Sequence, residues 1–272
     1  MSDQRAPVEQ SPLWQRTFST SPQHPGVDRL VVSLRSARER VALLSSRIVG
    51  SLPSLTQHDV SHLDGLWTVA STIAGDDYDL NPVEGYVLGM ALLIHDAALC
   101  HEAYEGGQAT VRATTQWRDA HHRRLANQGS ADLDETDFEA LRALHASQAA
   151  TLATTAWQSS DADPSYIIDD ADLRTHYGPL IGQIASSHHW DIEDVATRFA
   201  VSRPPAAFLP ASWSVHPLPI ACLLRAADAG HIDSSRAPTF LLKVLEMNSV
   251  SKSHWVAQNH LGRLTPNPDD PT

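Results

Sequence analysis

Six side chains that can bind a metal ion lie on or beside stripes of apolar residues that a helix would turn toward the core: His62, His95, Asp96, His145, His188 and Asp228. Burying an unpaired carboxylate or imidazolium costs several kcal/mol. A lone histidine on such a stripe is more often a hydrogen-bonded core residue, and a lone aspartate can be a cap or an ion-pair partner. Six of them on separate inward faces, without a comparable supply of inward lysines, indicate a shared cation.

The ligand types restrict the identity of that cation. Imidazole nitrogens and carboxylate oxygens, without thiolates, suit Mn, Fe, Co, Ni or Zn, and Mg at an oxygen-rich position. One or two divalent ions are therefore the predicted cofactor. The two cysteines of the chain, Cys100 and Cys222, have no part in this site.

Two amphipathic helices are predicted to carry the first ligands. Residues 56–74 place His62 on one face with Leu66, Val69 and Ile73. Thr56 and Asp59 resemble a capping box at the start of this helix. Asn81-Pro82-Val83-Glu84 then combines an N-cap residue, proline at N1 and glutamate at N3. The helix that it opens ends in Leu92-Leu93-Ile94-His95-Asp96.

Three further helical patterns bring in the remaining candidates. His145 shares a stripe with Phe138 and Leu141, and His188, with His189 next to it, follows Ile181 and Ile184. Asp228 lies beside a stripe formed by Ile220, Leu224 and Ala227. Since no stretch alternates apolar and polar residues over six positions, the predicted fold is all-α.

The predicted domain organisation is a flexible N-terminal arm over residues 1–26, one helical domain over residues 27–263 and a disordered tail over residues 264–272. Residues 27–49 carry five arginines among apolar residues. This pattern can indicate membrane or partner contact, but we interpret it as a solvated outer helix. Residues 101–131, apart from a short helix near residues 118–125, and residues 158–177 are predicted to be loops.

Composition excludes several classes of protein. A net charge of -12 over 272 residues argues against loose binding to nucleic acid or to anionic membranes. There is no apolar run of 18 residues and no secretory signal at the N-terminus. Together with the two cysteines, this predicts a cytoplasmic protein. The chain contains no Walker A loop, G-x-S-x-G, H-E-x-x-H or Cys-x-x-Cys motif.

The order His…His-Asp…His…His-His…Asp resembles the HD superfamily of metal-dependent phosphohydrolases. The segments His58-Asp59-Val60-Ser61-His62, Leu141-Arg142-Ala143-Leu144-His145 and Leu224-Arg225-Ala226-Ala227-Asp228 are similar to one branch of it. That branch is the HD domain found ahead of a Hsp90-like ATPase domain in bacterial proteins. The similarity spans roughly residues 50–260.

This resemblance implies an HD-domain helical bundle with a buried metal site. It implies that one ion is held by His62, His95, Asp96 and Asp228. His145, His188 and, as a further candidate, His189 match the extra histidines of binuclear members, in which the signature aspartate bridges two ions. His58 would be an outer-shell or substrate-facing residue. Arg225, Arg236 and also Arg142 are candidates to bind a phosphate, and a surface salt bridge is the alternative for Arg142 and Arg236.

Two functions follow as hypotheses. The first is a phosphohydrolase or phosphodiesterase that uses a metal-activated water on a nucleotide or another small phosphate ester, with Asp96, Arg225, Arg236 and His58 as catalytic residues. The second is a catalytically weak HD module that regulates or binds a partner, such as a Hsp90-like ATPase domain. Ala97-Ala98-Leu99 after the His-Asp pair and Trp190-Asp191 after the His-His pair depart from the pattern of many relatives.

Overall fold

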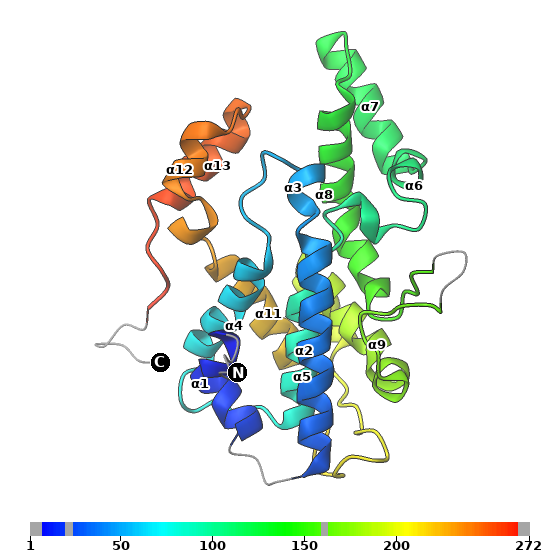
Figure 1. The fold of residues 1–272 in the computed structure, drawn as a ribbon, viewed down its shortest axis with the longest axis vertical. Coiled ribbons are helices and arrows are strands. Elements are labelled where there is room, and N and C mark those ends of the chain that lie inside the picture. The colour runs from blue at the N-terminus through cyan, green and yellow to red at the C-terminus, as the bar shows by residue number, and fades with distance from the viewer. Residues whose placement is uncertain (1–6, 20–23, 159–162, 266–272) are drawn as a thin grey trace.

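The computed structural model describes residues 7–19, 24–158 and 163–265. Within these ranges the regular secondary structure is helical, with two isolated β-bridges and no strands. The predicted all-α fold class and helical bundle are confirmed. The helix α5 (Pro82–Ile94) lies at the centre, next to α2 (Pro25–Ser45) and in contact with α4 (Val60–Ala74), α9 (Ala171–Ser186) and α11 (Pro217–Gly230) (Figure 1).

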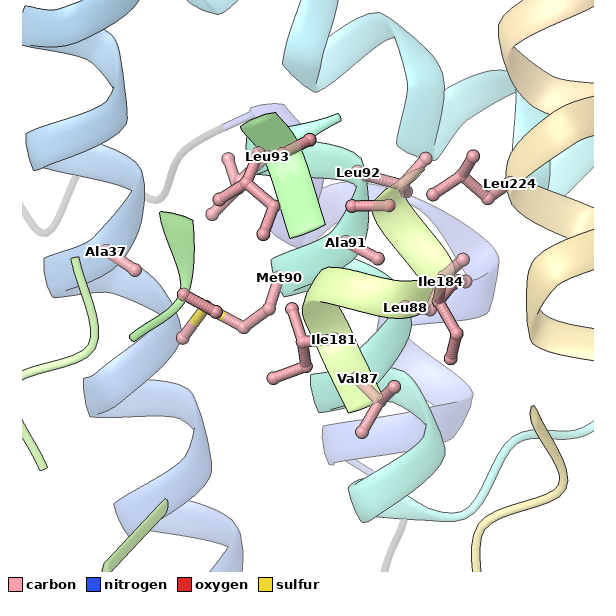
Figure 2. Packing of buried hydrophobic residues seen from close by; sticks show 14 of the residues in the cluster. Ala37, Val87, Leu88, Met90, Ala91, Leu92, Leu93, Ile181, Ile184 and Leu224 are labelled. Atoms are coloured by element: carbon pink, nitrogen blue, oxygen red, sulfur yellow. The ribbon is translucent and has the colours of Figure 1, made fainter. Parts of the chain in front are cut away.

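The sequence explains why α5 is the central helix. Its N-terminus has the predicted capping box, in which Asn81 Oδ1 accepts from the backbone N–H groups of Val83 and Glu84 while Glu84 accepts from the N–H of Asn81. All residues of α5 are buried, because it is apolar on every side. Figure 2 shows Leu88 and Leu92 of α5 among side chains of α9 and α11.

The remaining helices complete the bundle and add two projecting pairs. Figure 1 shows α7 and α8 rising on one side of the molecule and α12 and α13 on the other. The bounds are α3 (Ile48–Ser51), α6 (Gln108–Arg112), α7 (Thr115–Gln128), α8 (Leu133–Leu152), α10 (Ile192–Arg198), α12 (Thr239–Val244) and α13 (Ser249–Asn259). Short helical turns are η1 (Pro7–Gln10), α1 (Pro12–Trp14), η2 (Gln15–Ser19), η3 (His101–Ala103), η4 (Ser187–His189) and η5 (Ser234–Arg236).

The arginines of α2 are paired within the fold. Arg29 contacts Asp170 at 2.5 Å, Arg38 contacts Asp64 at 2.5 Å, and Arg40 contacts Asp169. The opposite face, including Leu30 and Leu34, is buried. The helix is thus an outer helix whose charges hold neighbouring elements. In the described part of the chain, no helix combines the length and the apolar character needed to span a bilayer.

The prediction of a flexible N-terminal arm is wrong for residues 7–19. This segment forms helical turns in which Leu13, Trp14 and Phe18 are buried, and the Trp14 ring lies 5.5 Å from that of Trp67 on α4. Its burial depends on contacts with residues far away in the sequence, so no local hydrophobic period predicts it. Pro25 and Gly26, the last residues of the predicted arm, already belong to α2. Residues 1–6, 20–23 and 266–272, which make up most of what remains of the predicted arm and tail, lie outside the described residues.

Several predicted boundaries also shift. The helix α4 starts at Val60 with Asp59 as N-cap, because the Asp59 carboxylate accepts from the N–H of Ser61. Ile73, predicted to face inward, is 42% exposed in the last turn of α4. Residues 101–131 contain α6 and α7, and Asp170 in the predicted loop 158–177 caps α9.

Candidate metal centre

The carboxylate of Asp96 is the meeting point of the predicted ligands. Its Oδ2 atom lies 3.3 Å from Nε2 of His95 and 3.8 Å from Nε2 of His62. Its Oδ1 atom lies 3.4 Å from Nε2 of His145 and 3.8 Å from Nε2 of His188. Nε2 of His58 also lies 3.7 Å from Oδ2. The two oxygens of one carboxylate therefore face different imidazoles, an arrangement that can bridge two cations.

The ligand atoms form two groups of cation size. In the first group, one ligand atom each of His62, His95, Asp96 and Asp228 lies within 4.8 Å of the others. In the second group, the same holds for His145, His188 and His189. These residues come from α4, the end of α5, α8, η4 and α11, so the structure brings together every metal ligand predicted from the sequence.

Local helix geometry orients three of the imidazoles. Nδ1 of His95 lies 2.9 Å from the carbonyl oxygen of Leu92, and Nδ1 of His145 lies 2.8 Å from that of Arg142. Nδ1 of His188 lies 2.5 Å from the carbonyl oxygen of Ala185. In each case the acceptor is three residues earlier in the chain. Because a carbonyl only accepts, each Nδ1 carries a hydrogen, and Nε2 is the nitrogen that remains on the side of Asp96 to bind a metal ion.

Two buried nitrogen atoms are placed where they could bind a metal ion. Nε2 of His62 and Nε2 of His95 have no hydrogen-bond partner in the described residues. Nε2 of His95 approaches Asp96 and, at 3.6 Å, Asp228, without the alignment of a hydrogen bond. A buried polar atom left without a partner is unfavourable. A divalent cation between these atoms would satisfy them.

Without a cation, the carboxylates hold a proton at the site. Burial alone would lower the pKa of His95, but the neighbouring carboxylates of Asp96 and Asp228 outweigh it and raise that pKa well above its usual value. Burial would raise the pKa of Asp96, but His95 holds it well below its usual value. Burial, helped by Arg236, lowers the pKa of His62.

A pocket of about 230 Å³ opens onto the metal ligands. It lies between α8, which provides Phe138 and Arg142, and α13, which provides Ser251, His254, Trp255 and Gln258. Arg236 and His58 also line it. The site is therefore accessible to a small molecule, which would contact both the candidate metal ligands and α13.

Arg236 is a buried cation that faces this pocket. It is 6% exposed, and no carboxylate of the described residues lies within the 4.0 Å of an ion pair. Its guanidinium donates to the carbonyl oxygens of Gln57 and His231 and, at 2.5 Å, to Nε2 of His58. Burial lowers the pKa of His58 to about 4, with Arg236 as the next cause, so His58 is a neutral acceptor. This pair can present an N–H group to an anion.

Arg225 does not belong to the phosphate-binding set predicted from the sequence. Its guanidinium donates to the carbonyl oxygens of Ser187 and Trp190, and it does not line the pocket. It thus holds the turn η4, which carries His188 and His189. Arg142, in contrast, lines the pocket and is exposed.

Sequence reasoning missed His231. This histidine is 5% exposed, and its Nδ1 lies 2.8 Å from Nδ1 of His62. It continues the stripe of Ile220, Leu224 and Ala227 at a spacing of four residues, which was the available signal. The pocket residues of α13 were also missed as site residues, because their helix carries no metal ligand.

Comparisons with known proteins identify the family of the chain. No curated protein and no solved structure matches it. The model of one protein family, HD-CE, matches residues 52–272, which include all the metal-ligand candidates and the whole pocket lining. The resemblance to an HD-type domain is therefore confirmed. The match covers most of the chain, and the chain belongs to the HD-CE family.

Proposed function

We propose that the chain is a metal-dependent phosphohydrolase or phosphodiesterase that acts on a nucleotide or another small phosphate ester. The observation that carries this proposal is the Asp96 carboxylate, whose two oxygens face separate sets of imidazoles beside a buried guanidinium. Histidine and carboxylate ligands arranged in this way serve hydrolytic metal centres.

The donor set fits one or two divalent cations. His62, His95, Asp96 and Asp228 would hold one, and His145, His188 and His189, with Asp96, would hold the other. Bound there, divalent cations supply Lewis acidity toward a phosphoryl oxygen and lower the pKa of a water molecule. His62, His95, Asp96 and His145 are buried, and their low-dielectric surroundings strengthen these electrostatic effects.

The residues around the ligands have distinct roles in this proposal. Arg236 binds a phosphate oxygen with N–H groups directed into the pocket, and His58 fixes the orientation of its guanidinium. Arg142 adds a second positive charge at the exposed wall of the pocket. A pocket of about 230 Å³ suits a phosphate group with a small substituent inside and the remainder of the substrate toward α13.

A second candidate function is a regulatory module, supported by the apolar surface of α12. No residue of α12 is buried, and Phe240 and Val244 are 73% and 55% exposed. Val250 at the start of α13 is 66% exposed. An exposed patch of this kind is typical of a partner-binding surface. Such a partner could be the Hsp90-like ATPase domain that the family resemblance implies.

Metal analysis and a phosphatase screen test the proposal. The purified protein is expected to retain a divalent metal and, with Mn²⁺ added, to release phosphate from aryl phosphates or nucleotides. Asp96→Ala should abolish both, whereas Asp169→Ala, which removes an exposed carboxylate paired with Arg40, should change neither. Arg236→Gln should keep the metal and lower kcat by about 10²–10³-fold, as for loss of one stabilising donor. Bound metal without turnover on any phosphoester would favour the regulatory module.

A further inference from the structure

His62 is the exception among the buried imidazoles of the metal centre. His95, His145 and His188 each place Nδ1 against a main-chain carbonyl oxygen three residues earlier, so their own helical turn fixes the position of the hydrogen. His62 lies in the first turn of α4, and its Nδ1 faces Nδ1 of His231, 169 residues away, at 2.8 Å. The two rings are parallel within 2°.

Two neutral histidines joined through their Nδ1 atoms share one hydrogen in one of two ways. If the hydrogen is on His231, then His62 carries its own hydrogen on Nε2 and has no lone pair for a metal. If the hydrogen is on Nδ1 of His62, the lone pair of Nε2 points into the ligand cluster. We propose that His231 is a positioning residue, which accepts the Nδ1–H of His62 and so makes His62 a metal ligand.

The surroundings of His231 hold its ring in the position that this role requires. A Cβ atom added to Gly65 would lie 2.4 Å from Cε1 and Nε2 of His231, so the ring rests directly on the backbone of α4. The carbonyl oxygen of His231 accepts from Nη1 of Arg236 at 3.1 Å. These contacts fix both the ring and its main chain.

The other nitrogen of His231 can keep its hydrogen. His231 borders a second pocket, of about 330 Å³, which is lined by Ser61, Asp64, Thr68 and Asp233 among others. Nε2 of His231 is not among the fully buried nitrogen and oxygen atoms of the described residues that lack a hydrogen-bond partner. The tautomer that the proposal assigns to His231, with Nδ1 unprotonated and Nε2 protonated, therefore leaves no buried donor unsatisfied.

The test compares the metal affinity of two substitutions at one position. His231→Asn puts a carbonyl oxygen where Nδ1 of the histidine lies and is expected to keep the wild-type affinity for Zn²⁺ or Mn²⁺. His231→Leu fills the space without an acceptor and is expected to weaken metal binding by about 10–100-fold, as for other outer-shell partners of a metal-bound histidine. Equal affinity of His231→Leu and wild type for both metals would overturn the proposal.

Gly65→Ala provides an independent variant that leaves both histidines in place. It should displace the His231 ring and weaken metal binding in the same direction as His231→Leu. His24→Leu, at the N-terminus of α2, removes a histidine that caps a helix and should leave metal affinity unchanged. Thermal unfolding in excess chelator shows that the variants are folded. A purely structural role for His231 would lower the Tm of the metal-free variants without changing the affinity of the folded protein for metal.

NMR of the zinc-loaded wild type reads the hydrogen position directly. The ¹⁵N shifts of His231 should be those of a ring with hydrogen on Nε2 only, and a hydrogen on Nδ1 of His231 would contradict the proposal. The inference rests on the metal centre of the proposed function but not on its phosphate chemistry. Zinc binding that depends on His231 in a protein without turnover would therefore support the inference while removing the hydrolase. Phosphate release by the wild type, together with unchanged metal affinity in His231→Leu, would support the hydrolase and contradict the role of His231.

Discussion

At the scale of single residues, His95 is the candidate ligand at which a metal ion and a proton would compete most directly. Its Nε2 lies between Asp96 and Asp228, and their carboxylates raise its pKa well above the usual value of 6.5. His62 and His188 have lowered pKa values, because they are buried, and are neutral at the same pH. In the metal-free protein, a proton on His95 therefore partly compensates the two carboxylates.

We predict that metal binding near neutral pH releases about one proton, because the cation must displace the proton from His95. The metal affinity should rise with pH up to the pH at which His95 is already deprotonated in the metal-free protein. Isothermal titration calorimetry in buffers of different ionisation enthalpy measures this release. Asp228→Asn removes one of the carboxylates that raise the pKa of His95, so metal binding to this variant should release fewer protons. A release of zero in all buffers would show that His95 is neutral in the free protein.

The residues of the centre divide into those that a local pattern reveals and those that it does not. His62, His95 and His145 lie on apolar stripes, so their inward direction was predictable. His231 lies on the same stripe as Ile220 and Leu224, but its role comes from a neighbour in another helix. Arg225 was misjudged because closeness in sequence to Asp228 does not fix the direction of a long side chain, which turns to the carbonyl oxygens of η4.

At the scale of elements, the contact between α8 and α9 sets the position of the second ligand group. The helix α8 carries His145, and α9 leads directly into His188 and His189. The two helices approach closely at Gly182, where a Cβ atom would lie 2.0 Å from the carbonyl oxygen of Ala150. The carbonyl oxygen of Ala150 belongs to the main chain, so no side-chain movement can make room for a Cβ atom at Gly182.

We predict that Gly182→Ala forces α8 and α9 apart and lowers the free energy of unfolding by roughly 1–3 kcal/mol, which is typical of overpacking. It should also weaken metal binding at the group of His145, His188 and His189 more than at the other ligand group, because only these three residues lie on the separated elements. Gly50→Ala is the matched control, because a Cβ atom there meets nothing within 4 Å. Urea denaturation and metal stoichiometry measure both effects. Equal stability of the two variants would contradict the close contact.

The helices that were predictable are those with strong local signals. The start of α5 was placed correctly because Asn81 and Glu84 form a capping box, with Pro82 at N1, within four residues. The start of α9 was missed because Asp170, its N-cap, was interpreted as part of an acidic loop, and its partner Arg29 lies 141 residues away. Residues 7–19 are too short to show a period, and their packing depends on Trp67.

At the scale of the whole molecule, the metal centre makes folding sensitive to acid. Burial lowers the pKa of His58 and of His188 from 6.5 to about 4. The pKa values of His62, His189 and His231 are also lowered, chiefly by burial. The unfolded chain binds protons at these residues at a higher pH than the folded chain does. Protonation below pH 6.5 therefore favours the unfolded state.

We predict that the metal-free protein loses stability as the pH falls from 6.5 to about 4. His58 and His188 would each contribute roughly 3 kcal/mol of this loss when the whole interval is crossed. His95 does not offset this loss, because its raised pKa gives stability that is already fully present below pH 6.5 and is lost only as the pH rises through its folded value. The lowered pKa values of Asp96 and Asp228 give stability that is lost only as the pH falls below about 3.8, outside this interval.

Urea denaturation in chelator across this pH interval measures the effect, and the variant His188→Gln isolates one contribution to it. Removing a histidine that is neutral when folded and protonated when unfolded should flatten the pH dependence of the variant relative to wild type, whatever the substitution costs at neutral pH. The exposed His122, substituted in the same way, should leave the slope unchanged. Stability that stays level or increases as the pH falls below 6.5 would mean that these imidazoles are already protonated in the folded chain. Their Nε2 lone pairs would then be unavailable to a metal, and the centre inferred around Asp96 would lose its ligands.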